Sequence, residues 1–532
     1  MTTAGSTPLW TRREDLLAAL GEDKTWDLAV IGGGATGLGV ALDAAMRGFS
    51  VVLLESRDFA AGTSSRATKL VHGGVRYLAQ GNVPLVTEAL HERSRLLHNA
   101  PHLARPLAFV MPAYQWWEVP FYGIGLKMYD LLAGSHGLGR TEFLSRHETL
   151  RCLPGVQASG LVGGVKYWDG QFDDARVALA LARTAATQGA LLVNHCPVDG
   201  LIHDDGKVAG VVCEDRETGR LLSVRARCVV NATGVWVDGV RAMDGDALGH
   251  PVRPMVAPSQ GVHLVVDAEF LPGDHALLVP KTRDGRVLFA VPWMGKLILG
   301  TTDTPRHDLA LEPEPFAHEV AFILNESARY LRRPPQRTDV RSCWVGLRPL
   351  VKAPEAGEED TKALSREHTV LISHSGLVTV TGGKWTTYRS MAEDVLRKCM
   401  TENLLPHRSG GVTRHQMLVG ADKTIPTQAP LGNPGALQPY GSEAAAVLAL
   451  PGAQRQLGGG LTEAMVRFAA RHEYARTVED VLARRVRLLF LDARLAGSLA
   501  PQVGAILAQE TGRDPEIAAF EALAAKYLLL PA

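Results

Sequence analysis

Three basic side chains in this sequence occupy positions where a charge is costly unless a negative group lies beside it. Arg76 and Lys384 each follow a pair of glycines, and Arg348 lies within the apolar stretch from Trp344 to Leu350. An uncompensated charge in such surroundings opposes folding. The formal net charge of the chain is zero, so a general basic surface does not account for these residues. Together they would suit an anionic ligand, and the phosphate of a small substrate is the anion that we expect.

Two histidines and a tyrosine accompany these cations. His72 lies four residues before Arg76, which would put both side chains on one face of a helix. The intervening Gly73–Gly74 pair leaves room for a ligand close to the backbone. Tyr77 follows Arg76 directly. His263 lies in a short apolar β segment, where a lone histidine is more often structural than catalytic.

The stretch from residue 27 to residue 55 supplies the element that must hold a cofactor beside this set. A short apolar run is followed by Gly32, Gly34 and Gly37, then by a helix of small residues, and then by a second apolar run that ends at Glu55. Strand, glycine turn, helix N-terminus and acid in this order are typical of an adenine-dinucleotide fold, with the pyrophosphate on the helix and the ribose on the acid. No second signature of this kind follows a predicted strand, so NAD(P)H is not expected as a co-substrate.

Three further segments are expected to complete the cofactor site. They are the hydroxyl-rich loop from Gly62 to Lys69, the end of a buried strand at Asn231 and a helix start after Gly382, whose free N–H groups can stabilise negative charge. The cofactor-contact candidates are Gly32, Gly34, Ala35, Thr36, Gly37, Glu55, Thr63, Ser64, Ser65, Lys69, His72, Thr233, Gly234, Gly383, Lys384, Thr386 and Thr387.

Several motifs resemble those of the aerobic, respiratory FAD-dependent glycerol-3-phosphate dehydrogenases. The likeness is collinear from about residue 25 to residue 400 and includes VIGGGATGLGVALDAAMRGFSVVLLE, GTSSRATKLVHGGVRYL, NATGVW, PWMGKLILGTTD, GLRPL and GGKWTTYR. It implies FAD as the cofactor, oxidation of sn-glycerol 3-phosphate to dihydroxyacetone phosphate, and a quinone as electron acceptor. For that reaction we expect His72 as the base and His263 as the runner-up. Arg76, Arg348 and Lys384 would hold the phosphate or the developing oxyanion, and Tyr77 would position the substrate.

Two other functions compete with this interpretation. One is a soluble oxidase that passes the same electrons to O₂, and the other is a flavin-binding protein with a structural or RNA-modifying role. The zero net charge and the clustered cations argue against the second and against nucleic acid as a partner. A homodimer is compatible with the sequence, which does not set an oligomeric state.

The predicted fold is α/β, with a Rossmann-like FAD-binding domain interleaved with an antiparallel β substrate domain and followed by a C-terminal α-helical cap. We expect an N-terminal arm (1–24), an oxidoreductase region (25–400), a linker (401–435) and a C-terminal helical domain (436–532). Within the oxidoreductase region, FAD-binding segments are predicted at about 25–115, 173–240 and 340–400, and substrate-domain segments at about 116–172 and 241–339.

The cysteines and the hydropathy pattern bear on the compartment. Six scattered cysteines without a CxxC pair or metal-ligand grouping predict reduced, mostly buried thiols in a cytoplasmic protein with no metal. No apolar run approaches the ~18 residues that a membrane-spanning helix needs, and no signal-peptide core is present. We therefore expect a cytoplasmic protein, and the resemblance implies that it lies peripherally on the inner face of the cell membrane.

Three local patterns complete the predictions. Thr11 and Glu14 have capping-box spacing, which predicts a short amphipathic helix within the arm. The aromatic segment 115–132 is interpreted first as an element packed on the core, and second as a surface at a membrane interface. Arg484, Arg485 and Arg487 lie in a predicted helix over 478–491, and a solvated face is their default interpretation.

Overall fold

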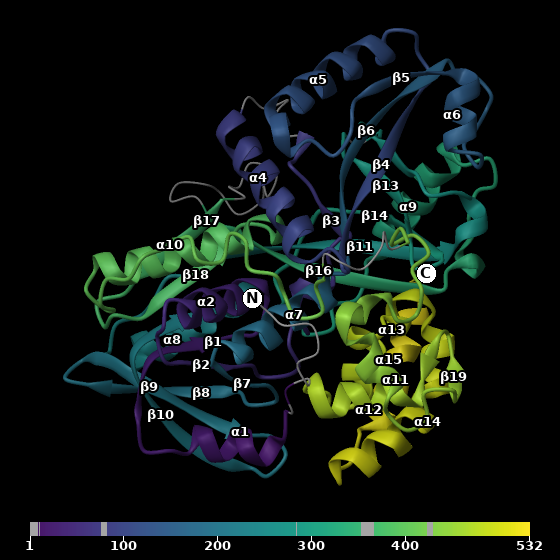
Figure 1. The fold of residues 1–532 in the computed structure, drawn as a ribbon. Coiled ribbons are helices and arrows are strands. Elements are labelled where there is room, and N and C mark those ends of the chain that lie inside the picture. Colours follow the sequence, from purple (N-terminus) through teal and green to yellow (C-terminus); the bar gives the residue numbers. More distant parts are fainter. Residues whose placement is uncertain are drawn as a thin grey trace.

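The computed structural model describes residues 9, 11–75, 82–283, 285–352, 367–422 and 429–531. Within these ranges the chain forms two large sheets and a group of C-terminal helices beside them, as Figure 1 shows. This arrangement confirms the predicted α/β fold with a dinucleotide-binding part, a β-rich second part and a helical C-terminal part. No helix in the described ranges is both long enough and apolar enough to span a membrane.

The first sheet carries the glycine signature. In the described residues its strands run in the order β17-β18-β10-β1-β2-β7, and β9 and β8 extend it from β10 by antiparallel pairing. The pairs from β18 to β7 are parallel, which requires crossover segments on the faces of the sheet and explains why β2 and residues 28–31 of β1 are apolar. The strands are β1 (Thr25–Ile31), β2 (Val51–Leu54), β7 (Leu191–Val193), β8 (Val198–Asp204), β9 (Lys207–Asp215), β10 (Arg220–Asn231), β17 (His368–Ile372) and β18 (Val378–Gly382).

Helices α2 (Ala35–Met46), α7 (Asp174–Thr187) and α10 (Tyr388–Thr401) share one hydrophobic cluster with this sheet. Small residues bring α2 close to the strands. A Cβ at Gly37 would lie 1.9 Å from the carbonyl oxygen of Gly32. The packing of helix on strand at this turn therefore depends on the absence of a side chain.

The second sheet is largely antiparallel, as predicted, although β12 and β4 pair in parallel. Its strands are β3 (Leu70–Val71), β4 (Ala104–Ala113), β5 (Glu142–Ser145), β6 (Gly163–Phe172), β11 (Val256–Asp267), β12 (Ala276–Val279), β13 (Leu288–Trp293), β14 (Lys296–Gly300), β15 (Thr304–Pro305) and β16 (Ser342–Val351). The predicted segment boundaries near 115 and 340 were wrong for β3, β4 and β16. These strands pair with β6 and β11 in the second sheet, because tertiary pairing and not chain position assigns a strand to a sheet.

The remaining helices lie around the two sheets. They are α4 (Val83–Asn99), α5 (Glu118–Ala133), α6 (Arg146–Cys152), α8 (Val237–Ala247) and α9 (Ala317–Tyr330), with short turns η1 (Thr63–Ser65), η3 (Gly234–Trp236) and η6 (Trp385–Thr387). In Figure 1, α5 lies at the top of the molecule, at the end away from β8, β9 and β10. The prediction that segment 115–132 packs on the core was wrong for much of its apolar surface, since Trp116, Phe121 and Leu131 are 76%, 66% and 79% exposed.

The C-terminal part contains α11 (Ala444–Leu448), α12 (Glu463–His472), a π-helical turn η8 (Asp480–Arg485), α13 (Leu488–Leu491), α14 (Ala493–Thr511), α15 (Ile517–Leu528) and a small β19–β20 hairpin at Gln456–Gly458 and Leu461–Thr462. The predicted continuous helix over 478–491 is interrupted, because Arg487 adopts a left-handed φ of 62° between η8 and α13. The described part of the predicted linker packs on the main body, where Leu405, Leu418 and Leu431 are buried.

The N-terminal arm begins with α1 (Arg13–Leu20). Its predicted capping box was wrong, because Arg12 is the N-cap and Thr11 instead donates its hydroxyl to the carbonyl oxygen of Arg471. Arg13 is buried and pairs with Asp215, so the arm is held on the first sheet as expected.

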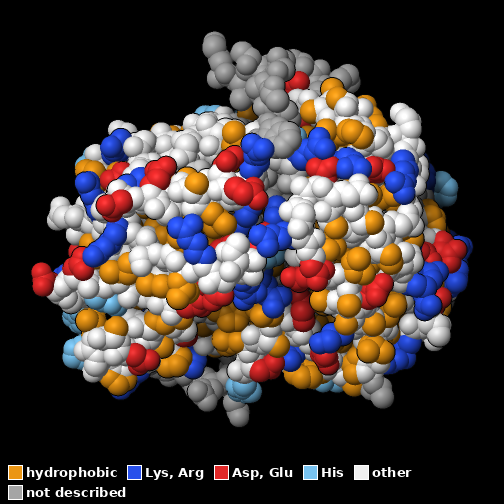
Figure 2. All heavy atoms as spheres, turned by 90° about the horizontal axis from the view of Figure 1, so that it is seen from below, with side chains coloured by type: hydrophobic (Ala, Val, Ile, Leu, Met, Phe, Trp, Pro, Cys, Tyr) orange, Lys and Arg blue, Asp and Glu red, His pale blue; other side chains and the backbone are white. Residues whose placement is uncertain are grey.

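The surface carries charges of both signs, and the cysteine thiols lie mostly in the interior. On the face shown in Figure 2, acidic and basic side chains are interspersed. All six cysteines are free, and each is buried except Cys152, which is partly exposed. The prediction of mostly buried, unpaired thiols is therefore confirmed.

Candidate active site

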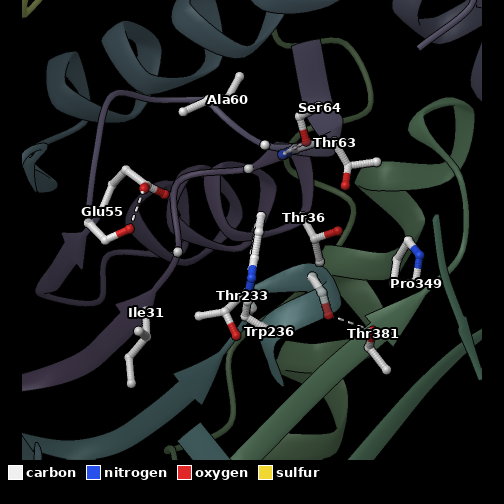
Figure 3. Close-up of a pocket in the computed structure, with 18 of the residues that line it drawn as sticks. Ile31, Thr36, Glu55, Ala60, Thr63, Ser64, Thr233, Trp236, Pro349 and Thr381 are labelled. Atoms are coloured by element: carbon white, nitrogen blue, oxygen red, sulfur yellow. Dashed lines mark hydrogen bonds between the residues drawn. The ribbon is translucent and has the colours of Figure 1, made fainter. Parts of the chain in front are cut away.

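A cleft of about 560 Å³ opens at the carboxyl ends of β1, β2, β10 and β18. In parallel α/β sheets this edge is where ligands bind. Figure 3 shows side chains from several separate segments, among them Glu55, Thr63, Thr233 and Thr381, arranged around one space. The cleft is thus assembled by the topology of the sheet.

The glycine turn forms one wall of this cleft. Gly32 adopts φ 105°, a conformation that side chains disfavour, and Gly34 is the N-cap of α2, so the N-terminus of that helix borders the cleft. Glu55 at the end of β2 accepts a hydrogen bond from the Gly33 N–H at 2.6 Å. The partial positive charge of the helix suits a pyrophosphate, and the carboxylate suits a ribose diol.

The loop after β2 forms a second wall. The Ser64 hydroxyl accepts from the Ala35 N–H at 2.9 Å, and the Thr63 hydroxyl donates to the Leu347 carbonyl oxygen at 2.6 Å. Both residues, predicted to contact the cofactor, line the cleft. Two other predicted contacts do not, since Ser65 and Lys69 lie behind the loop and are almost fully buried.

Lys69 has a structural environment. Its ammonium group donates to the Ser65 carbonyl oxygen and to Asp174, at 2.7 Å and 2.8 Å, and lies 4.7 Å from the centre of the Trp344 ring. Burial, and then the nearby Arg487 charge, lower the pKa of Lys69 to about 7, although Asp174 opposes this. The residue therefore braces the loop from inside and does not face the cofactor cleft.

The ends of β10 and β18 form the third wall. Thr233 and Gly234 line the cleft, and the Thr381 hydroxyl donates to the Gly234 carbonyl oxygen at 3.1 Å (Figure 3). Gly383 and Lys384 also line it, as predicted. Thr386 and Thr387 are buried beside the cleft without lining it, because Thr386 donates its hydroxyl to the His72 carbonyl oxygen.

A second group of predicted residues lies on neighbouring strands of the other sheet. On β11, His263 is buried, stacks on Trp344 with ring centres 4.0 Å apart, and has its Nε2 2.9 Å from the Thr68 hydroxyl. Burial, and then the charges of Lys69 and Arg348, hold the pKa of His263 well below its ordinary value. The imidazole is therefore neutral, and its protonation is disfavoured in these surroundings.

Arg348 on β16 already has a negative neighbour. It lies 3.3 Å from the Asp303 carboxylate and donates to the Thr302 carbonyl oxygen at 3.0 Å. The sequence predicts an anionic partner for this charge, and Asp303 is one that the chain itself provides. The strand of Arg348 still adjoins the cofactor cleft, since Leu347 bonds Thr63 and Pro349 lines the cleft.

Only some residues of the predicted anion site are among those that the structure describes. Lys384 borders the cleft, Arg348 lies on the adjoining strand, and the His72 backbone contacts Thr386. Arg76 and Tyr77 lie outside the described residues. The segments at 63–72, 347–349 and 383–386 nevertheless converge, joined by the Thr63–Leu347, Trp385–Ser64 and Thr386–His72 hydrogen bonds.

Sequence reasoning missed several residues of the cleft. The indole of Trp236 extends into its middle (Figure 3), and the cleft is further lined by Pro197, Val198, Leu309, Leu311, Glu312, Pro349 and Thr381. Trp236 ends a motif that was recognised, but no local pattern marks residues 309–312. They reach the cleft only because the second sheet folds against the first.

The arginine cluster of η8 was also misjudged. Arg484, Arg485 and Arg487 are 4%, 3% and 0% exposed, so their default interpretation as a solvated face was wrong. Arg484 and Arg485 both pair with Asp58, which precedes the cofactor loop. Arg487 donates to the Ser65 carbonyl oxygen at 2.7 Å and to Asp174 at 3.1 Å.

Comparisons with known proteins agree with this geometry. Residues 27–389 match the family of FAD-dependent oxidoreductases, and residues 412–517 match the C-terminal domain of alpha-glycerophosphate oxidase. A mitochondrial glycerol-3-phosphate dehydrogenase of Rattus norvegicus is 42% identical over 537 residues, which are 94% of this chain and 72% of that protein. The chain belongs to the FAD-dependent glycerol-3-phosphate dehydrogenase family.

Two further glycerol-3-phosphate dehydrogenases are similar over nearly the whole of this chain. The mitochondrial enzyme of Arabidopsis thaliana is 40% identical, over 95% of this chain and 86% of that protein. The glycerol-3-phosphate dehydrogenase of Bacillus halodurans, solved with FAD, is 29% identical, covers 97% of both chains and superposes with a TM-score of 0.75.

FAD, the cofactor of this family, fits the cleft. A Cβ placed at Gly34 would meet only the Ser64 hydroxyl, at 3.1 Å, so the backbone at the start of α2 is open to a phosphate. Glu55 stands at the ribose position, and Thr233, Gly234 and Lys384 border the rest of the cleft. The volume of about 560 Å³ lies in the range typical of cofactor pockets.

Proposed function

We propose that this chain oxidises sn-glycerol 3-phosphate to dihydroxyacetone phosphate and passes the electrons to a quinone at the inner face of the cell membrane. The observation that carries the proposal is the identity of 40–42%, over 94–95% of the chain, with proteins named glycerol-3-phosphate dehydrogenase. The convergence of the FAD cleft with the segments that contain His72, His263, Arg348 and Lys384 supports it.

The reaction removes a hydride from C2 of the substrate and a proton from its hydroxyl group. FAD, when bound, supplies the hydride acceptor. Among the chain's own residues, Lys384 at the cleft and Arg348 on the adjoining strand would stabilise the phosphate or the developing C2 oxyanion. Arg76 and Tyr77 are proposed to position the substrate on the same side.

Two histidines compete for the hydroxyl proton. His72 remains the candidate that its sequence context favours, and its backbone is held by Thr386. His263 remains the runner-up, because its imidazole is buried and neutral, but burial and the Arg348 charge make it a weak base. His72→Asn and His263→Asn variants, reduced by substrate in a stopped-flow instrument, would separate them. Loss of the base slows flavin reduction by about 10²–10⁴-fold, whereas loss of a positioning residue slows it less.

Direct reduction of the bound flavin is the decisive test of substrate identity. Under anaerobic conditions, glycerol 3-phosphate should bleach the flavin absorbance of the purified protein, and free glycerol should do so very poorly. A flavin that stays oxidised with glycerol 3-phosphate, in protein that dithionite does bleach, would contradict the proposed function.

The membrane part of the proposal rests on the exposed apolar surface of α5. Trp117, Phe121, Ile124, Met128 and Leu131 recur at spacings of four and three residues, so they form one stripe on the helix, and each is at least 45% exposed. Aromatic and aliphatic side chains on an exposed helix face are suited to the headgroup region of a bilayer. A quinone in that bilayer would then be near the protein.

The α5 stripe can be tested by liposome binding. Replacing Trp116 and Trp117 with Ser should release the protein from liposomes of mixed phosphatidylglycerol and phosphatidylethanolamine without changing activity toward a soluble dye. Leu221→Ser, which removes an equally exposed side chain from β10, should leave binding unchanged. If the Trp variants instead change only the oligomeric state, the stripe is an interface between two copies of the chain.

An oxidase is the second candidate, because residues 412–517 match a domain described from alpha-glycerophosphate oxidase. The two functions differ only in the acceptor. An oxidase would form about one peroxide per substrate in air with or without a quinone. A quinone-linked dehydrogenase would form little peroxide, and a quinone analogue would raise its turnover.

A further inference from the structure

The segment from Arg306 to Phe316 connects β15 to α9 without regular secondary structure and runs along the edge of the FAD cleft. Leu309, Leu311 and Glu312 line the cleft, although they belong to the substrate sheet side of the chain. Leu309 and Leu311 are 36% and 42% exposed, so their apolar side chains are available to a group in the cleft. We call residues 306–316 the strap.

The strap is tied to the first sheet at its middle. The indole N–H of Trp236, which extends into the cleft, donates to the Leu309 carbonyl oxygen at 3.1 Å. Trp236 follows the Thr233–Gly234 turn at the end of β10. Leu309 is therefore fixed to the wall of the cleft that also bears the predicted cofactor contacts.

Glu312 makes the second and stronger attachment. One carboxylate oxygen pairs with the Arg66 guanidinium, and the other accepts from the Tyr527 hydroxyl at 3.2 Å. Arg66 is 6% exposed and follows Thr63 and Ser64, the loop residues that line the cleft. Burial opposes the charge of Arg66, but Glu312 outweighs it and keeps the pKa of Arg66 above its ordinary value.

Tyr527 brings a third part of the chain to the same point. It lies on α15, in the C-terminal helices, and is 5% exposed. One carboxylate therefore joins the strap, the cofactor loop and the C-terminal part. The bond from Arg66 to Glu312 is charge-assisted at both ends, and such hydrogen bonds are about twice as strong as neutral ones.

From these contacts we infer that Glu312 is a positioning residue that latches the strap over the FAD cleft, and that the C-terminal helices thereby help to retain the cofactor. The strap contains no β-ladder or helix hydrogen bonds of its own, and Pro313 is buried next to Glu312. Its position therefore depends on side-chain contacts such as those of Glu312. Without the latch, the strap would keep its Trp236–Leu309 hydrogen bond, but Leu311 and Glu312 would no longer be held beside the cofactor. The inference concerns FAD retention, and it holds whatever substrate or electron acceptor the protein uses.

The test compares two glutamates of the strap. Glu312→Gln removes the charge at the latch, whereas Glu314→Gln removes the charge of a neighbour that is 72% exposed in its side chain and lies 4.0 Å from Lys526. The rate of FAD release from the holoenzyme is followed by the rise of flavin fluorescence after strong dilution, which prevents rebinding. We expect release to be about 10-fold faster or more in Glu312→Gln, the change that losing one charge-assisted hydrogen bond produces, and unchanged in Glu314→Gln.

Tyr527→Phe provides a second measurement with no change in charge. It removes one of the two attachments of Glu312 and should speed FAD release by about 2- to 10-fold. Thermal unfolding of each apoprotein serves as the readout of general stability, and it should differ little between Tyr527→Phe and wild type. Equal release rates in Glu312→Gln and Glu314→Gln would overturn the inference. If Glu312→Gln does not fold, an unchanged release rate in Tyr527→Phe overturns it by itself.

Discussion

The glycine turn at Gly32–Gly37 and the arginine cluster of η8 border the cofactor loop from opposite sides. At the turn, the structure depends on backbone shape, since a side chain at Gly37 would collide with the Gly32 carbonyl group. At the cluster, it depends on buried charge, since Arg484 and Arg485 share the Asp58 carboxylate. Steric exclusion and charge neutralisation thus act on the same loop.

The two sides of the loop should respond differently to mutation. A collision at the turn displaces α2 from β1, and with it the helix terminus that faces the pyrophosphate. Loss of the Asp58 charge removes the carboxylate that pairs with the buried Arg485, although Arg484 keeps Glu479 and Asp480. The penalty then falls on the C-terminal part that carries these residues. We therefore expect the cluster to control global stability and the turn to control cofactor binding.

The largest effect should come from Asp58→Asn. It keeps the shape of the side chain but removes the charge that Arg484 and Arg485 both contact, so it should lower the free energy of unfolding by about 3–5 kcal/mol. Urea denaturation measures this directly. The control is Glu269→Gln, which removes the exposed partner of Arg333 and should cost about 0–1 kcal/mol. Equal losses in both variants would mean that the cluster is no more important than a surface pair.

Gly37→Ala should come next. Its Cβ would lie 1.9 Å from the Gly32 carbonyl oxygen, so the backbone must move, at a cost of about 3 kcal/mol. The variant should also lose most of its flavin, which is measured by the ratio of absorbance at 450 nm to that at 280 nm. Gly239→Ala in α8 is the matched control, because a Cβ there meets no atom within 4 Å. A flavin-replete, stable Gly37→Ala protein would show that α2 can shift without consequence.

Glu55→Gln should act on binding with little effect on folding. The carboxylate lines the cleft and accepts from the Gly33 N–H, so its neutralisation removes one charge-assisted hydrogen bond to the ribose and weakens FAD binding by about 1.5–3 kcal/mol. Isothermal titration of apoprotein with FAD measures the difference. Glu22→Gln on the exposed surface should bind as wild type does. If Glu55→Gln lowered the free energy of unfolding as much as Asp58→Asn does, the side of the loop at the glycine turn would contribute to global stability in the same way as the arginine cluster.

The same comparison explains what could be predicted from the sequence. The glycine turn is local, because its strand, turn, helix and acid follow one another in the chain, and the cleft residues Gly32, Gly34 and Glu55 were found in this way. The partners Asp58 and Arg484 lie 426 positions apart, and no local pattern links them. An arginine-rich helix has the same sequence whether it faces water or a buried carboxylate, so the cluster was assigned to the surface.

The fold and the candidate site also differ in how far the sequence predicts them. The parallel order of β1, β2 and β10 follows from the spacing of apolar runs and crossover segments. β16 pairs with β11, and this pairing places Arg348 beside Asp303. Which of the two sheets a strand joins depends on tertiary contacts that the local sequence does not show. Residues such as Leu309 and Glu312, which the strap brings to the cleft, carry no signal that a single sequence could reveal.

The smallest predicted effect concerns pH and the His195–Asp480 pair, which lies beside the cluster with Nε2 3.0 Å from the carboxylate. Burial opposes the charge on the imidazole, but Asp480 outweighs it, so the folded-state pKa of His195 is raised. Because the native state then binds more protons than the unfolded state, the stabilisation is fully present below about pH 6.5, the ordinary pKa of histidine. It is lost as the pH rises through the raised folded-state pKa.

The free energy of unfolding should therefore decrease between pH 6 and pH 9 by more in wild type than in His195→Gln, as measured by urea denaturation across that range. His407→Gln, an exposed control, should keep the wild-type slope. Parallel pH profiles for wild type and His195→Gln would show that the charge of this pair does not contribute to holding η8 on the first sheet.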